Sequence, residues 1–366
     1  MADARVLPIS DVKAGIKAET NGNFGVGLDN SGADGTAYRQ LPIVQVQKPT
    51  FNITRESRLL SGKGSVKAAG DTIISQKGGT VTMPFDMIAT PELLSQHLCL
   101  VGQEHSESGS GGSEVHQTEF DGSSNAKSVG GATSGNVPHS VNIAYYPAAS
   151  EGIRICGAVC SDLNISADYG TNGGFLTMSG NYFSGFSKTE STSTALETDF
   201  TIANWTAPSS SYYHIGGLTT KTLDVEGNAT QNLVLKSFNF NISNGVNRLG
   251  FNGNGNAEAY ALPEYVITGN ISIKYDDEFD YGSGNNVIQD FLDGDTMSLA
   301  LKWGDVESTA AAGEMNILAE IQYTGDPAQD ISENGIFHNL AFECVQNGST
   351  EAFLVKQFVG ESQSAW

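Results

Sequence analysis

The segment SFNFNIS, residues 237–243, alternates strictly between large apolar and small polar side chains. Successive side chains of an extended chain point to opposite faces, so the two classes separate completely. The apolar face holds Phe238, Phe240 and Ile242, and the polar face holds Asn239, Asn241 and Ser243. This pattern predicts a half-buried strand whose hydrated face is polar but uncharged.

The same alternation recurs in PTFNIT, residues 49–54, and in SDLNIS, residues 161–166. In the first of these segments Asn52 and Thr54 share the polar face. Each segment contains an N-I-S or N-I-T triplet, which would be a glycan acceptor only in a secreted protein. We interpret the triplets as hydrated strand faces, because the alternation by itself accounts for them.

A strand running directly into a helix is predicted in GGTVTMPFDMIATPELLSQHLCLVG, residues 78–102. Thr90 is a suitable N-cap, Pro91 suits the first helical turn, and Gly102 follows the last turn. Five side chains at helical spacing share one face of this helix. They are Leu93, Leu94, His97, Leu98 and Val101.

This unit occurs twice in the chain. Residues 49–85 and residues 237–275 each consist of a strand, a long glycine-containing excursion and a returning strand. A second helix is predicted in NNVIQDFLDGD, residues 285–295, where Gly294 ends it. We interpret the two units as a tandem duplication. The alternative is that two similar β patterns arose independently.

The predicted organisation is an N-terminal arm, residues 1–40, followed by β domains at 41–195 and 196–366. The arm contains few residues suited to packing. A Gly/Ser-rich insertion at 103–140 interrupts the first domain, and its composition predicts an exposed or partly disordered loop. The predicted fold class is therefore mainly β, with one short flanking helix in each domain.

The chain is acidic, with 19 Lys and Arg against 41 Asp and Glu and a formal net charge of −22. Counterion-release binding to nucleic acid needs clustered Lys and Arg, so this function is not expected. The alternative is that acidity serves only solubility. The start lacks an apolar leader and no apolar run could span a bilayer, which predicts cytosolic synthesis and no membrane partner. We expect the four cysteines to be reduced and to pack as small apolar side chains in the interior. They are Cys99, Cys156, Cys160 and Cys344.

Three groups of residues were candidates for metal binding or catalysis. The histidines His105, His116 and His139 have irregular spacing within the insertion. DNSGADG at 29–35 lacks ligands of a calcium loop, and DDEFD at 276–280 lacks a second acidic cluster for glycosidase chemistry. No nucleophile elbow, phosphate loop or H-E-x-x-H motif occurs. We therefore expect no enzyme, no cofactor, and no catalytic, cofactor-binding or metal-binding residues.

Three segments, with the strand-to-helix units above, resemble the tail tube (major tail) proteins of long non-contractile bacteriophage tails, in the larger two-domain type. They are LNISADYGTNGGFLTMSGNYFSG at 163–185, LKSFNFNISNGVNRL at 235–249 and YVITGNISIKYDD at 265–277. The resemblance covers most of residues 40–360 as a pattern, without a sharp motif. It implies two tandem β-sandwich or barrel-forming tube domains, each with one short flanking helix.

The resemblance also implies a structural virion protein. Three chains would form a ring with pseudo-sixfold symmetry, or six chains would form the ring, and stacked rings would form a hollow tube. Genomic DNA would pass through the tube without specific binding. Further partners would be the tape measure, terminator and distal tail proteins. The protein would be made in the cytoplasm of a host bacterium and would end in the virion tail.

Two sets of site residues follow from this resemblance. The polar residues expected to face the lumen are Asn52, Thr54, Asn239, Asn241 and Ser243. The residues of the long excursions expected to contact other rings or subunits are Leu59, Leu60, Ile73, Ile74, Leu249, Phe251, Leu262 and Tyr265. The alternative for the second set is that these side chains cap their own sandwich.

The alternative function is a carbohydrate-binding or adhesin-type β protein. The segment SSSYYH, residues 209–214, favours it, because tyrosines next to small polar residues can form an aromatic platform for a sugar. The tube protein and the carbohydrate-binding protein make different predictions about assembly, which microscopy can separate.

Overall fold

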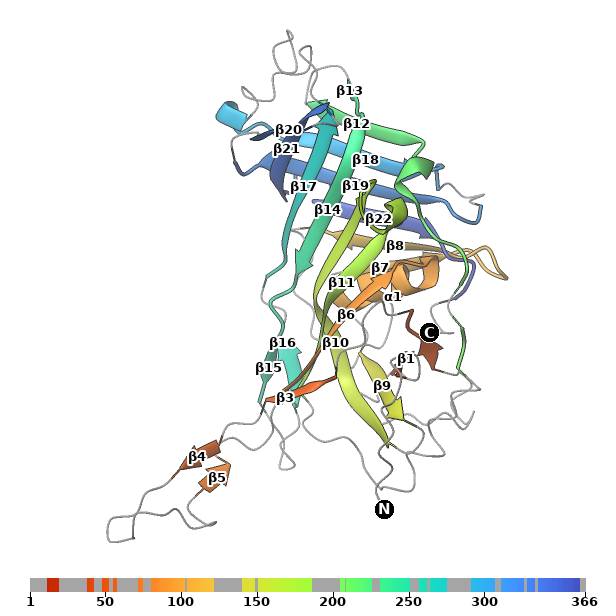
Figure 1. The fold of residues 1–366 in the computed structure, drawn as a ribbon, viewed down its shortest axis with the longest axis vertical. Helices are drawn as coiled ribbons and strands as arrows, with labels where there is room; N and C mark the ends of the chain where they lie inside the picture. The colour runs from red at the N-terminus through yellow and green to blue at the C-terminus, as the bar shows by residue number, and fades with distance from the viewer. Residues whose placement is uncertain are drawn as a thin grey trace.

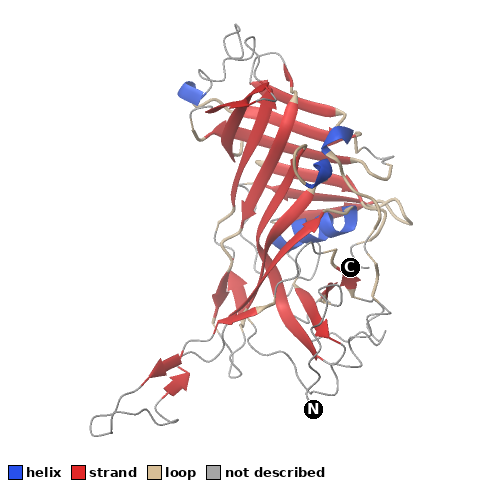
Figure 2. Ribbon diagram, viewed as in Figure 1, coloured by secondary structure: helices blue, strands red, loops and turns tan. Residues whose placement is uncertain are grey.

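The computed structural model describes residues 12–19, 38–42, 48–52, 55–57, 72–74, 80–102, 104–121, 140–148, 151–185, 205–207, 209–225, 231–250, 257–261, 264–274, 291–306, 311–325, 328–332 and 335–362. Within these ranges the chain is mainly β, and all pairings between its strands are antiparallel. Figure 2 shows how strands fill the body of the molecule. The mainly β fold class predicted from the sequence is confirmed.

Strands make up nearly all of the described elements. In the first half of the chain they are β1 (Lys13–Ala18), β2 (Arg39–Gln40), β3 (Thr50–Asn52), β4 (Arg55–Ser57), β5 (Thr72–Ile74), β6 (Thr80–Ile88), α1 (Pro91–Val101), β7 (Glu104–Ser108), β8 (Val115–Phe120), β9 (Val141–Ala148), β10 (Glu151–Asp168), a short 3-10 helix (Asn172–Gly174) and β11 (Thr177–Ser184). In the second half they are a short 3-10 helix (Ile215–Gly217), β12 (Thr220–Val225), β13 (Gln231–Asn232), β14 (Leu235–Ser243), β15 (Asn247–Leu249), β16 (Ala259–Ala261), β17 (Val266–Lys274), β18 (Met297–Trp303), β19 (Met315–Tyr323), β20 (Ala328–Ser332), β21 (Gly335–Cys344) and β22 (Phe353–Phe358).

Eight of these strands form one continuous antiparallel sheet, which we call the front sheet. Their order across the sheet is β3, β6, β11, β10, β14, β17, β21 and β20. The junction between β10 and β14 joins the two halves of the chain, with Leu163 opposite Ile242 and Asn164 opposite Asn241. The strands predicted at 161–166 and 237–243 are therefore confirmed, and they are direct neighbours.

A second layer of strands packs against the front sheet. Figure 1 shows β14 and β17 crossing in front of β18 and β19 at a steep angle. In this layer β2, β1 and β9 lead to the first part of β10, and a separate series runs β13, β12, β18, β19, β22, β8 and β7. The whole network of strands curls around one apolar core, to which Phe85, Phe240 and Phe342 all belong.

The two halves of the chain use the same strand order. In the first half the neighbours run β3, β6, β11, β10, β9, β1 and β2. In the second half they run β14, β17, β21, β19, β18, β12 and β13, in the corresponding chain positions. The boundary predicted between residues 195 and 196 lies outside the described ranges and stays a prediction. The two halves share one sheet and one core.

The predicted first helix is confirmed at both ends. Helix α1 begins at Pro91 after the N-cap Thr90, whose hydroxyl accepts a hydrogen bond from the Leu93 amide at 3.4 Å, and Gly102 follows its last residue. One apolar face was predicted, yet the structure buries nearly the whole helix, including Ser95 and Gln96. The helix is enclosed because β8, β10 and β22 all contact it. Of the predicted second helix, only a turn at 291–293 lies in the described ranges.

Two segments predicted to be loosely packed are ordered strands. Strand β1 lies in the predicted arm, pairs with β9 and has four buried residues, so the expectation of few packing residues is wrong there. Residues 104–120 of the predicted loop form the β7–β8 hairpin, whose second strand pairs with β22. Sequence patterning missed this hairpin because its buried face uses His105, His116 and Thr118 in place of apolar residues.

The two excursions differ in how they meet the body. Strands β4 and β5 form a separate hairpin that projects from the body (Figure 1). Strands β15 and β16 instead stay against the body, because the hydroxyl of the buried Tyr260 donates to the Gly157 carbonyl at 2.6 Å and accepts from the Gly185 amide at 2.7 Å.

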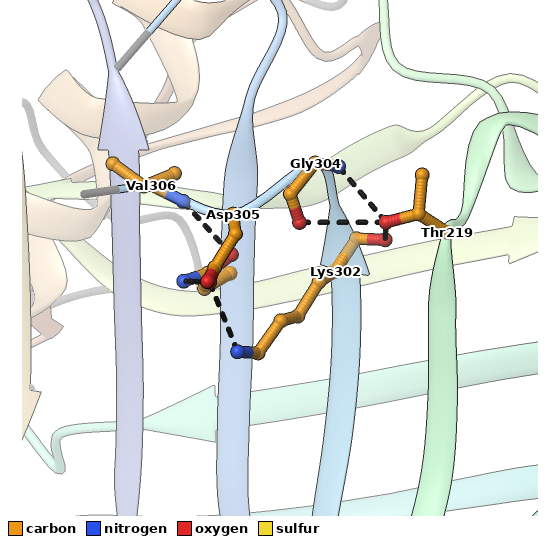
Figure 3. A network of polar contacts seen from close by, with 6 residues as sticks. Thr219, Lys302, Gly304, Asp305 and Val306 are labelled. Carbon is orange, nitrogen blue, oxygen red and sulfur yellow. Dashed lines mark hydrogen bonds and ion pairs between the residues drawn. The ribbon is translucent and has the colours of Figure 1, made fainter. Parts of the chain in front are cut away.

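A polar network fixes the turn after β18 (Figure 3). The Thr219 hydroxyl donates to the Lys302 carbonyl at 3.1 Å and accepts from the Gly304 amide at 3.1 Å. The Asp305 carboxylate accepts from the Lys302 ammonium at 3.0 Å and from Asn316 at 3.2 Å. The hydrogen bond from Lys302, followed by that from Asn316, lowers the pKa of Asp305. These contacts anchor the start of β12 to the β18–β19 turn.

We expect Gly269→Ala to destabilise the fold by about 1–3 kcal/mol, the usual cost of overpacking a filled core. A Cβ at Gly269 would come within 2.5 Å of the Asn239 carbonyl oxygen and would clash with the Phe342 ring. Urea denaturation measures the change. Gly325→Ala is the matched control, because a Cβ there meets no atom within 4 Å. Equal stability of the two variants would contradict the packing argument.

We also expect His97 to make stability depend on pH. Its Nδ1–H donates to the Leu93 carbonyl at 2.6 Å and its Nε2 accepts from the Tyr182 hydroxyl at 2.5 Å, so the buried ring is neutral. Burial lowers the pKa of His97 from 6.5 to about 4. Between these two values the unfolded chain binds the proton and the folded chain does not, so stability falls as the pH drops from 6.5 towards 4.

The measurement is the free energy of unfolding of wild type and His97→Gln at pH 7.5 and pH 5. The variant should lose less stability than the wild type on acidification, by on the order of 1–2 kcal/mol, since each pKa unit corresponds to about 1.4 kcal/mol. The same acid-induced loss in both proteins would show that His97 is not the responsible group.

Candidate functional surface: the polar face of the front sheet

One face of the front sheet is mostly polar, and we call it the polar face. Its side chains occupy alternate positions of strands whose other positions fill the core. Because the registers align, these residues form rows that cross the sheet. The central row is Asp86, Ser179, Asn164, Asn241, Thr268 and Glu343. The next row is Ile88, Thr177, Ser166, Asn239, Asn270 and Ala341.

Two further rows complete the polar face. One is Pro84, Asn181, Asp162, Ser243 and Val266, and the other is Asp168, Ser237, Ser272 and Asn339. No residue in the four rows is Lys or Arg. Two lysines lie at the margin. The Lys236 ammonium is 3.2 Å from the Asp330 carboxylate and 4.8 Å from the centre of the Phe337 ring, and the exposed Lys274 follows Ser272 on the same face of β17. The rows therefore carry acidic charge without a basic side chain among them.

Neutral donors hold the acidic groups of the polar face. The Asp162 carboxylate accepts from the Ser161 hydroxyl at 2.8 Å and from the Asn181 amide at 3.1 Å. The Asp168 carboxylate accepts from the Gly170 backbone amide at 2.5 Å. Hydrogen bonds from neutral groups orient a carboxylate without cancelling its charge. The surface is thus polar and weakly anionic, which suits contact with water and disfavours binding of phosphates.

The structure brings together most of the predicted lumen-face residues. Asn239, Asn241 and Ser243 lie on β14 in three of the rows. Asn52 lies on β3 opposite Thr80, at the edge of the same sheet. Thr54 lies outside the described residues. Whether this face lines a lumen stays a prediction.

The neighbouring strands supply polar-face residues that were not among the predicted site residues. They are Asn164 and Ser166 of β10, Thr177, Ser179 and Asn181 of β11, and Thr268 and Asn270 of β17. The signal was present as period-two alternation in LTMSGNY and VITGNIS. What the sequence does not contain is the register that aligns these residues into rows.

The residues of the excursions that were predicted to contact other subunits differ in their surroundings. Leu249 of β15 is 51 % exposed, as a contact with another subunit requires. Tyr265 contacts the Phe120 ring and donates to the Gly102 carbonyl at 3.1 Å, so it packs within its own chain. Ile73 and Ile74 lie in the projecting β4–β5 hairpin. The residues outside the described ranges are Leu59, Leu60, Phe251 and Leu262.

The candidate histidines take part in folding contacts. His105 Nε2 lies 3.0 Å from His116 Nδ1, and His116 Nε2 donates to the Glu361 carbonyl at 2.8 Å. Burial lowers the pKa of His116, partly offset by the hydrogen bond to Glu361 and by nearby acidic groups. His139 lies outside the described residues, as do 29–35 and 276–280. Within the described ranges no group of three or more His, Cys, Asp or Glu could hold a metal ion.

An exposed aromatic cluster lies at the end of the β10–β11 hairpin. Tyr169, Phe175 and Tyr212 are exposed; the rings of Tyr169 and Phe175 lie against His214, and the ring of Tyr212 lies against Phe175. His214 Nε2–H donates to the Gly173 carbonyl at 2.8 Å, and its Nδ1 accepts from the Gly216 amide at 2.9 Å. The cluster includes two residues of the SSSYYH segment and is firmly held by its turn.

A comparison of the chain with protein-family models finds no match, and a comparison with curated protein sequences finds none either. Among the described residues, none of the helices is both long enough and apolar enough to cross a membrane. The geometry of the polar face is therefore the main basis for a functional proposal.

Proposed function

We propose that this chain is a structural subunit of a hollow tube, of the kind found in long non-contractile bacteriophage tails. The observation that supports this proposal most directly is the polar face. It is a continuous sheet surface to which both halves of the chain contribute with the same strand order, and its four rows contain no Lys or Arg. Three chains form a ring with pseudo-sixfold symmetry, since each chain supplies two equivalent units; a ring of six chains is the alternative. The polar face lines the lumen.

The electrostatics of the polar face support passage of DNA. Asp86, Asp162 and Asp168 repel phosphates, and the surrounding Asn, Ser and Thr side chains bind water. Retention of DNA requires Lys and Arg that displace its counterions. A lumen with these residues presents little friction to a moving duplex, and the genome passes through without specific binding.

The projecting β4–β5 hairpin supports stacking of rings. It extends from the body (Figure 1), where it can reach a neighbouring ring. A stacking contact is heterologous, so the same surfaces repeat along a filament until another protein stops them. In this proposal the further partners are the tape measure, terminator and distal tail proteins. The protein acts in the virion tail after synthesis in the host cytoplasm.

The experiment that tests the function is negative-stain electron microscopy of the purified full chain across a range of concentrations. We expect rings or hollow filaments with threefold or pseudo-sixfold end views, because the outermost strands of the front sheet, β3 and β20, each have one strand partner in the described part of the chain and can pair with another chain. Compact single subunits at every concentration would contradict the proposal.

A second experiment tests the role of the polar face. Assembled Asn241→Lys should retain short duplex DNA at low salt and release it as salt rises, whereas wild-type assemblies should retain none. The measurement is co-sedimentation of labelled DNA. Ser349→Lys, at an exposed turn before β22, controls for the added charge alone. Equal retention by the two variants would place the polar face away from the DNA path.

The second candidate function is carbohydrate binding, which the exposed aromatic cluster favours. Rings such as Tyr169 and Tyr212 can stack on a sugar, and their turn holds them in place. A glycan array on the same preparation separates the two functions. Binding by monomers that is lost in Tyr212→Ala would favour this candidate over the tube.

A further inference from the structure

The front sheet ends in two open edges. Strand β3 pairs with β6 on one side, and strand β20 pairs with β21 on one side. In the described part of the chain no strand pairs with the other side of either. Each edge exposes a large apolar side chain, Phe51 at 38 % on β3 and Ile331 at 74 % on β20. Open edges of this kind template pairing with another chain.

The junction between the two halves of the chain shows which kind of strand can pair with each edge. There β14 adds to the free side of β10 and covers it, with Phe240 opposite Ile165 and Asn241 opposite Asn164. Ile165 and Phe240 are fully buried as a result. Thus β10 is the outermost front-sheet strand of the first half, and β14, the first front-sheet strand of the second half, pairs with its free side.

Strand β3 corresponds to β14. Both are the first strand of their half in the front sheet, and each pairs with the strand that returns from an excursion. Their sequences also agree, since Phe51 begins FNIT and Phe240 begins FNIS. Phe51 is therefore the counterpart of Phe240, but it is not covered within its own chain.

Strand β20 corresponds to the last part of β10. The last part of β10 pairs with β11, the next front-sheet strand of the first half, and β20 pairs in the same way with β21 in the second half. Ile165 lies opposite Met178 of β11, and Ile331 lies opposite Ile336 of β21. NIS at 164–166 has its counterpart in DIS at 330–332. Ile331 is therefore the counterpart of the buried Ile165.

We infer that β3 of one copy of this chain pairs antiparallel with β20 of the next copy, in the register of the internal β10–β14 junction. This register places Phe51 opposite Ile331 and Asn52 opposite Asp330. The pairing extends the polar face from one chain to the next and covers both exposed apolar side chains. The contact is heterologous, and in the proposed tube the rotation between successive copies closes it into a ring. The number of copies in that ring rests on the proposed function, whereas the pairing follows from the two edges.

Disulfide trapping tests this register. Asn52→Cys and Asp330→Cys are made as two single variants and as one double variant of the full chain, and each is oxidised and run on a non-reducing gel. We expect a covalent dimer when the two single variants are mixed, and a covalent trimer with the double variant. All variants carry Cys344→Ser, because Cys344 is only partly buried whereas the other native cysteines are buried. Each single variant alone should then stay monomeric on the gel.

A second pair of variants tests the apolar part of the contact. Ile331→Asp should abolish ring formation in size-exclusion chromatography and microscopy, while far-UV circular dichroism stays unchanged because the side chain is exposed. Val234→Asp is the matched control, since Val234 is 62 % exposed and directly precedes β14, which has a strand partner on each side. Rings that form in the control but not in Ile331→Asp support the pairing.

The outcomes separate this inference from the proposed function. Rings without a cross-link between positions 52 and 330, or rings that survive Ile331→Asp, would overturn the β3–β20 pairing while leaving the tube proposal intact. Single subunits in wild-type preparations, with no cross-link in the mixed variants, would overturn both. A cross-link together with solid aggregates in place of hollow rings would support the pairing and contradict the tube.

Discussion

The antiparallel pairing of β10 with β14 is the contact on which the rest of the structure depends. It joins a strand from each half of the chain through seven aligned residue pairs. On one side it buries Leu163 and Ile165 against Ile242 and Phe240, and on the other it places Asn164 beside Asn241. A slip of one residue would exchange the two faces, exposing apolar side chains and burying amides, so this register is strongly specified.

This junction makes one surface out of two repeated units. The core beneath is shared, and the central polar row continues from Asp86 of β6 in the first half to Glu343 of β21 in the second. The outer strand β3 corresponds to β14, and the outer strand β20 corresponds to the last part of β10. The two outer strands of the front sheet therefore correspond to the two strands of the internal junction. In the proposed assembly, the link between fold and ring is the pair of outer strands of the front sheet, which expose Phe51 on one and Ile331 on the other.

Sequence reasoning predicted the elements that local rules control. Period-two alternation identified β14 and the last part of β10, and capping rules placed both ends of α1 at Thr90 and Gly102. Sequence reasoning failed where the buried side chains are polar. The β7–β8 hairpin buries His105 and His116, which pair with each other at 3.0 Å, so its composition resembled a loop. Strand β1 was missed in the same way, since its four buried residues include Lys17.

The amino-acid sequence by itself determined that the chain is mainly β, that its strands have one apolar and one uncharged polar face, and where its first helix begins and ends. These properties depend on residues close together in the chain, whose spacing decides which side each one faces. The tertiary structure alone decided that the polar faces align into rows, that α1 is enclosed, and that β3 and β20 remain open. Those features depend on the register between strands far apart in the chain, which is set by how the apolar side chains of both halves fill one common core.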